Sequence, residues 1–109
     1  MCRALTVLCV APDRQALADL KRAAVAADWE LAPGTTDERD AMAQLAAVRP
    51  QVLVVFGASE QLVSDARSAY PSLRIVADRA LPGATVVVTS LREVRGAIQG
   101  LPRPGGPVR

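Results

Sequence analysis

The feature that most restricts the fold of this chain is an unbroken apolar run in the segment 51–57. Five apolar residues, 52–56, follow one another between Pro50 and Gly57. A strand with one face in water alternates apolar and polar side chains, whereas a continuous β-branched run is typical of a strand covered on both faces. The run therefore predicts the central strand of a parallel sheet. Ligand-binding groups of such sheets lie just beyond the carboxyl ends of the strands, which here means residues 56–59.

Four further segments, 5–10, 29–32, 73–77 and 84–88, also have the composition of strands, and 29–32 is short and mixed enough for a sheet edge. The segments between them favour helices, except for the short link that precedes the last strand. The four helices are expected to begin at side chains that cap an N-terminus: Asp13, Thr35 with Glu38, Ser59, and Ser90 with Glu93. The first helix is expected to end near Asp28.

Apolar residues at helical spacing predict the face that each helix buries. The inward positions are expected to be Leu17, Leu20, Ala24 and Ala27 in the first helix, Ala41, Leu45 and Val48 in the second, Leu62, Val63, Ala66 and Tyr70 in the third, and Leu91, Val94, Ile98 and Leu101 in the last. Strands alternating with helices predict a three-layer α/β/α sandwich in a single domain, residues 1–101. The Pro- and Gly-rich tail 102–109 is expected to be disordered.

One connection does not fit the simplest scheme. Only six residues, 78–83, separate the fourth and fifth predicted strands, and a parallel crossover usually needs about a dozen or more. Either an extended segment runs back across the sheet, which we favour, or Pro82 and Gly83 form a tight turn and the fifth strand is antiparallel.

Composition narrows the classes of function. The 13 basic residues are interleaved with 11 acidic ones, a pattern that argues against nucleic-acid binding. There is no histidine, and Cys2 and Cys9 are not clustered with carboxylates, so neither a metal site nor a cofactor is expected. The apolar segment 5–11 is too short to span a membrane. We therefore expect a cytoplasmic protein with reduced thiols.

Two segments resemble motifs of the response-regulator receiver domain, a flavodoxin-like module of two-component signalling. Val48–Phe56 is similar to the Arg-Pro-Asp-(apolar)-Asp stretch of that family, and Tyr70–Val76 to its Tyr-Pro entry into the fourth strand. Gly83 and Ala84 match the family's Gly-Ala before the fifth strand. The resemblance covers residues 5–101 and implies a five-stranded, mainly parallel sheet in the order 2-1-3-4-5, here without the family's fourth helix.

The family phosphorylates an Asp after the third strand and holds Mg²⁺ with an acidic pair after the first. A hydroxyl residue and a Lys follow the fourth and fifth strands. The resemblance places these functions at positions where each required residue is replaced: Ala11 and Pro12 for the acidic pair, Phe56 for the phosphoacceptor, Ala77 for the hydroxyl and Thr89 for the Lys. The Phe56 ring is expected to fill the vacated site as part of the core.

These replacements predict a non-enzymatic pseudo-receiver that binds a protein partner without phosphorylation. The short link between the last two strands is expected to leave part of the sheet less shielded, near Ile75, Val76, Val86 and Val88. The expected interface around this patch comprises Arg74, Arg79, Arg92, Val94 and Arg95. A homodimer formed through it is one possible assembly. The alternative is a module that binds a small molecule or an anion at the strand ends, where the candidate ligand residues are Asp13, Ser59, Asp78 and Ser90.

Overall fold

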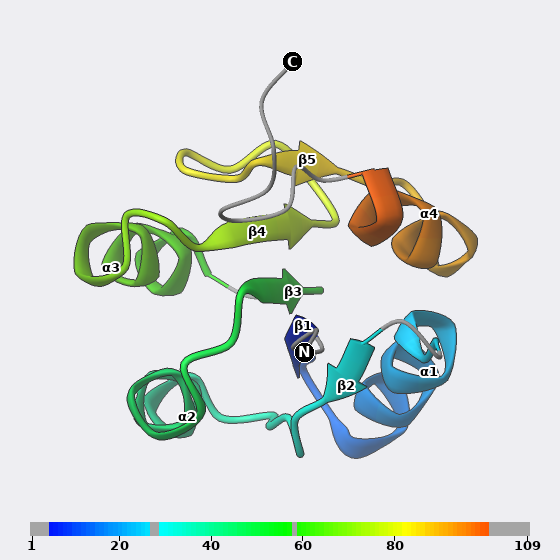
Figure 1. The fold of residues 1–109 in the computed structure, drawn as a ribbon, viewed down its shortest axis with the longest axis horizontal. Helices are drawn as coiled ribbons and strands as arrows, with labels where there is room; N and C mark the ends of the chain where they lie inside the picture. The colour runs from blue at the N-terminus through cyan, green and yellow to red at the C-terminus, as the bar shows by residue number, and fades with distance from the viewer. Residues whose placement is uncertain (1–4, 27–28, 58, 101–109) are drawn as a thin grey trace, which may run out of the picture.

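The predicted central strand is present and is covered on both faces. A computed structural model describes residues 5–26, 29–57 and 59–100 (Figure 1). In it, β3 spans Val52–Val55, and all four of its residues are buried. The predictions for Cys2, for residues 27 and 28, and for Leu101 and the tail fall outside the described residues.

All five strands belong to one parallel sheet. They are β1 (Leu5–Val10), β2 (Trp29–Leu31), β3, β4 (Arg74–Ala77) and β5 (Val86–Val87), in the order β2-β1-β3-β4-β5. Val52 of β3 is in register with Val7 of β1 and with Arg74 of β4. The predicted strand order is therefore confirmed. The antiparallel alternative for the fifth strand is wrong, because β4 and β5 pair in parallel.

Helices cover both faces of this sheet (Figure 1). On one side lie α1 (Arg14–Ala24) and α4 (Val94–Gly100), the latter entered through a 3₁₀ turn at Leu91–Glu93. On the other side lie α2 (Glu38–Val48) and α3 (Glu60–Ala69). Alternate residues of β3 point to opposite sides, so Val52 and Val54 pack with α1 and α4, whereas Leu53 and Val55 pack with α2 and α3.

The link from β4 to β5, residues 78–85, contains no helix. It does turn at Pro82 and Gly83, where the Ala84 N–H donates to the Leu81 carbonyl at 3.0 Å, but the strand that follows is parallel. Thr85 anchors the link, because its N–H donates to the Ile75 carbonyl at 2.7 Å and its hydroxyl oxygen accepts from the Ile75 N–H at 3.0 Å. Arg67 of α3 donates to the Gly83 carbonyl at 2.8 Å, and Leu81 is buried in the α2–α3 core. The link thus covers the face that a helix would otherwise cover.

Several helix ends differ from the sequence prediction. Helix α1 ends at Ala24, before the expected Asp28. The N-cap of α2 is Asp37, whose carboxylate accepts from the Arg39 N–H at 3.0 Å, so the predicted Thr35–Glu38 capping box is wrong. Val48 is also misassigned, since it is exposed at the end of α2. No helix within the described residues is long and apolar enough to cross a membrane.

Cys9 of β1 is fully buried between the sheet and the α1–α4 layer. Burial raises the pKa of its thiol from 9.0 to about 12, and nearby Lys21 opposes this shift only in part.

In a Cys2→Ser variant, we expect Cys9 to resist a disulfide reagent in the folded protein at about pH 8 and to react once the chain is unfolded. Fast modification of the folded variant would contradict this burial.

The same pKa shift predicts a loss of stability at high pH. The thiol ionises near pH 9.0 in the unfolded chain and near 12 in the folded one, so its contribution is complete below pH 9.0 and falls as pH rises towards 12. Urea unfolding across this range should show that fall in the Cys2→Ser variant. In a Cys2→Ser/Cys9→Val variant, the free energy of unfolding should fall less over the same pH range. Identical pH profiles for the two variants would contradict the conclusion that Cys9 ionisation causes the fall.

Candidate functional site

The positions that correspond to the receiver active site gather at the carboxyl edge of the sheet. Ala11 follows β1, Gly57 lies just beyond β3, and Asp78 follows β4. Gly57 has φ +71°, and a Cβ built on it would lie 3.1 Å from Pro12 Cγ, so Pro12 packs directly against the β3 turn. Ala11 and Ala77 are buried. Small apolar side chains and a proline therefore lie at the positions that the resemblance assigned to the metal ligands and the hydroxyl.

Phe56 is only half-buried, so the expectation that it belongs fully to the core needs correction. Its N–H donates to the Val10 carbonyl at 2.9 Å, which fixes the backbone in the sheet, and its ring packs at the margin of the α1–α4 core. The ring is not enclosed because it is the last side chain on this face at the open end of the sheet. Sequence reasoning identified the residue but not its exposure.

The two aspartates at this edge already have structural partners. Asp13 is exposed, and its carboxylate caps α1 by accepting from the Ala16 N–H at 2.8 Å. One carboxylate oxygen of Asp78 accepts from the Gly57 N–H at 3.1 Å, and the other lies 3.9 Å from the Arg79 guanidinium. Within the ranges that the structure describes, no group of three potential ligands is arranged for a metal ion.

Ser59 takes part in an interaction that the sequence analysis missed. Its N–H and hydroxyl donate to the Glu38 carboxylate at 2.8 and 2.6 Å, while the hydroxyl oxygen accepts from the Leu62 N–H at 3.3 Å and caps α3 as predicted. Glu38 therefore joins the start of α2 to the start of α3. The two residues are 21 positions apart, so no local spacing rule could have paired them.

The last predicted cap also has a different partner. The Glu93 carboxylate accepts from the N–H and hydroxyl of Thr89 at 2.7 and 3.1 Å, whereas the Ser90 side chain makes no capping bond. The predicted pairing of Ser90 with Glu93 is wrong by one residue. Thr89, the residue that the resemblance places at the family's Lys position, thus has its hydroxyl bound to a carboxylate.

These contacts share one chemical consequence. At three places on the carboxyl edge, a backbone N–H that an anionic ligand would use donates to a carboxylate of the protein itself. We call Glu38, Asp78 and Glu93 the edge carboxylates. Their negative charge opposes the binding of phosphate or another anion at these N–H groups.

The predicted interface is only partly accessible. Val94 is completely buried against the sheet, as are Ile75 and Val76, because α4 and the 78–85 link cover them. Val88 is also buried and Val86 is half-buried, so the expectation of an unshielded patch is wrong for all of these residues except Val86. Arg79, Arg92 and Arg95 are exposed, and Arg74 is half-buried. Arg92 and Arg95 line an open hollow of about 500 Å³ between α1 and α4.

No protein-family model and no curated protein matches this sequence. Among solved structures, the fold is similar to the isolated REC domain of RcsB from Salmonella enterica serovar Typhimurium, determined in the presence of phosphomimetic BeF3⁻. The TM-score is 0.59 and the sequence identity is 17%; the match covers 69% of this chain and 61% of that chain, less than two thirds of its length. The similarity shows that this chain has the receiver-like fold expected from its sequence.

The carboxyl edge predicts that phosphodonors leave the protein unchanged. Acetyl phosphate should transfer no phosphoryl group, because Phe56 offers no carboxylate and the edge carboxylates repel the donor. Beryllofluoride with Mg²⁺ should leave the amide resonances of Asp13, Gly57 and Asp78 where they are with Mg²⁺ alone. Saturable shifts of these resonances that require both reagents would contradict the prediction.

Replacing Phe56 by Asp should destabilise the fold. The substitution removes a ring from the edge of the core and adds a carboxylate one position beyond the Val55–Ala77 pair, where Asp78 also lies. We expect the free energy of unfolding to fall by about 1–3 kcal/mol, less than for a fully buried ring. Phe56→Leu, the apolar control, should cost about 1 kcal/mol. Equal urea midpoints for the Asp variant and the unchanged protein would disprove the packing role.

Proposed function

We propose that this protein is a pseudo-receiver, a signalling module that binds a partner protein without being phosphorylated. The observation that carries the proposal is the carboxyl edge, where Phe56 lies at the position that the resemblance assigns to the phosphoacceptor and the edge carboxylates accept from backbone N–H groups. A receiver switch needs a carboxylate nucleophile and oxygen ligands for Mg²⁺. This edge supplies neither at the positions that the resemblance assigns to them, while the receiver-like strand order around it is retained.

The alternative function, anion or small-molecule binding at the same edge, receives less support. Helix N-termini attract anions through N–H groups that lack a partner. At the start of α3, however, the Ser59 N–H and hydroxyl both donate to Glu38. An incoming anion would have to displace a carboxylate that is held by two hydrogen bonds.

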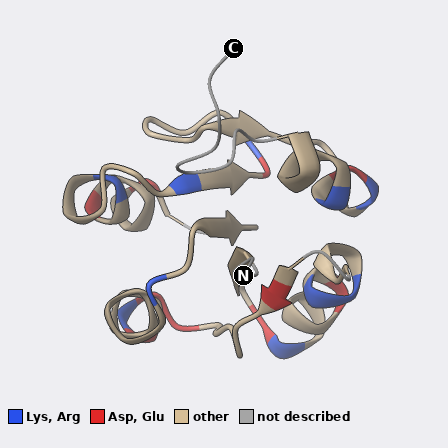
Figure 2. Ribbon diagram, in the orientation of Figure 1, with Lys and Arg blue, Asp and Glu red and all other residues tan. Residues whose placement is uncertain are grey.

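The hollow between α1 and α4 is the surface that best fits a protein partner. Arg92 and Arg95 line it together with the half-buried Leu91, and a Cβ built on Gly96 would meet no atom within 4 Å, so the space is open. Neither arginine has a hydrogen bond or an ion pair with a described residue, and basic positions lie on both flanking helices (Figure 2). Arginine beside apolar surface is typical of protein interfaces, and these charges favour an acidic partner surface.

Charge reversal tests this proposal. In a pull-down from the native cell, an Arg92→Glu/Arg95→Glu variant should no longer recover the partner protein that the unchanged protein recovers. Arg39→Glu, an exposed control on α2, should recover it as the unchanged protein does. Sedimentation velocity of the purified proteins tests whether the partner is a second copy, since the double variant would then have the lower mass. If both variants recover equal amounts of the partner and sediment with the same mass, the hollow between α1 and α4 is not the binding surface. Recovery that depends on acetyl phosphate would contradict phosphorylation independence.

A further inference from the structure

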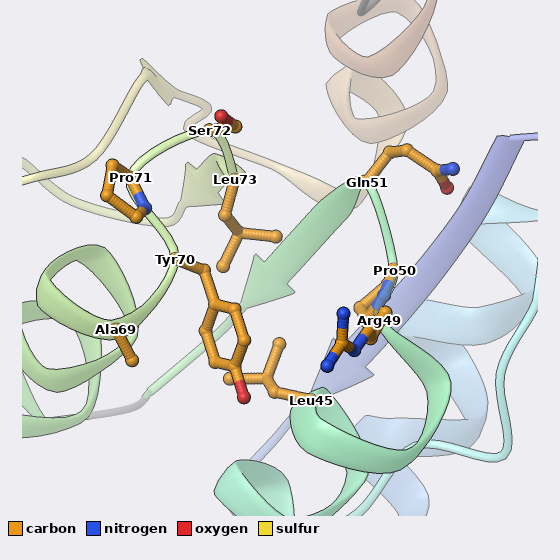
Figure 3. Close-up of a pocket in the computed structure, with 9 residues that line it drawn as sticks. All are labelled: Leu45, Arg49, Pro50, Gln51, Ala69, Tyr70, Pro71, Ser72 and Leu73. Atoms are coloured by element: carbon orange, nitrogen blue, oxygen red, sulfur yellow. The ribbon is translucent and has the colours of Figure 1, made fainter.

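A second pocket lies at the opposite edge of the sheet, between the C-terminal ends of α2 and α3 (Figure 3). Its volume is about 320 Å³, near the lower end of the range for small-molecule sites. Leu45 and Leu73, both buried, contribute apolar surface, and Pro50 and Pro71 lie where the two helices have ended. The pocket is far along the strands from the edge carboxylates and is independent of the proposed function.

Two polar groups face this apolar space. Tyr70 comes from the end of α3 and Arg49 from the end of α2, and they stand on different sides of the pocket in Figure 3. Neither the Tyr70 hydroxyl nor the Arg49 guanidinium has a hydrogen bond or ion pair with a described residue. An aromatic ring and a planar cation thus border a cavity of roughly the size of one small molecule.

The backbone at Arg49 adds a second observation. Arg49 ends α2 in the left-handed conformation, with φ 53° and ψ 58°, and is the one non-glycine residue with positive φ within the described ranges. Glycine or asparagine usually occupies this position, because a Cβ makes the conformation unfavourable. An arginine here places a long cationic side chain at the rim of the pocket at a cost in backbone strain. Strain of this kind is often found at binding sites.

The charges around the pocket restrict its ligand. The C-terminal ends of α2 and α3 each carry partial negative charge, which the Arg49 guanidinium offsets. The pocket therefore does not favour a multiply charged anion. It favours a flat ring that packs with Tyr70 and Arg49 and carries an oxygen to accept hydrogen bonds from the guanidinium.

We propose that this pocket binds a small aromatic molecule bearing one oxygen acceptor, either a carbonyl or a carboxylate. Arg49 donates to that oxygen, Tyr70 packs against the ring, and the two leucines hold its apolar edge. Carbonyl and carboxylate compounds share this oxygen acceptor, so the proposal covers both classes of ligand. Because the pocket is at the amino edge of β3 and β4, its occupation does not require any change at the carboxyl edge.

Amide chemical-shift titration with four simple probes tests the proposal. Benzamide and benzoate should shift the resonances of Arg49, Tyr70 and Leu73 at concentrations up to about 10 mM. Benzylamine, which carries a cation instead of an acceptor, should bind at least about tenfold more weakly, and so should cyclohexanecarboxylate, which lacks the aromatic ring. Binding of benzamide alone or benzoate alone would support the proposal and identify the class of acceptor.

A matched pair of variants separates the site from nonspecific binding. Arg49→Asn removes the guanidinium while suiting the left-handed backbone, so the fold should persist, and affinity for the bound probe should fall about tenfold. Arg39→Asn, on an exposed part of the same helix, should leave affinity unchanged. The proposal is overturned if neither acceptor probe shifts the pocket resonances, or if Arg49→Asn binds as tightly as Arg39→Asn does. Circular dichroism of both variants confirms that they are folded.

Discussion

The rest of the structure depends on covering both faces of β3. Its backbone pairs with β1 on one side and β4 on the other, so none of its edges meets water. Val52 and Val54 need the α1–α4 layer, and Leu53 and Val55 need the α2–α3 layer. A strand of four buried apolar residues thus requires three layers, and the neighbouring strands and all four helices are arranged to supply them.

Most of the fold could be predicted because its signals are local. The apolar run with Pro50 and Gly57 locates β3, and Asp13 and Ser59 cap the helices that they precede. The parallel direction of β5 was harder, since it depends on Thr85 bonding to Ile75 and on Leu81 reaching the core. Those contacts join residues distant in sequence, and a turn rule based on Pro82 and Gly83 alone could not decide between the alternatives.

The candidate site could be predicted in its composition but not in its contacts. Sequence shows that position 56 lacks a carboxylate, whereas the bond from Ser59 to Glu38 depends on how α2 and α3 meet. The assignment of Val94 to an interface failed for a different reason. Its four-residue spacing to Ile98 already predicts a buried helix face, and the structure places both in the core. For Val94, the helical spacing of apolar residues predicted burial correctly, whereas the short link between β4 and β5 suggested an exposed interface that the structure does not show.

The packing of α1 against α4 has a consequence for the order in which the chain can fold. Leu20 and Ala24 share one core cluster with Val94 and Ile98, although the helices stand at opposite ends of the sequence. A ribosome releases α1 long before it has made α4. During synthesis, the α2–α3 layer can close over its face of β1 and β3 while the other face still awaits its last helix. The nascent chain therefore leaves exposed the part of this face that α4 will cover until α4 itself has been made.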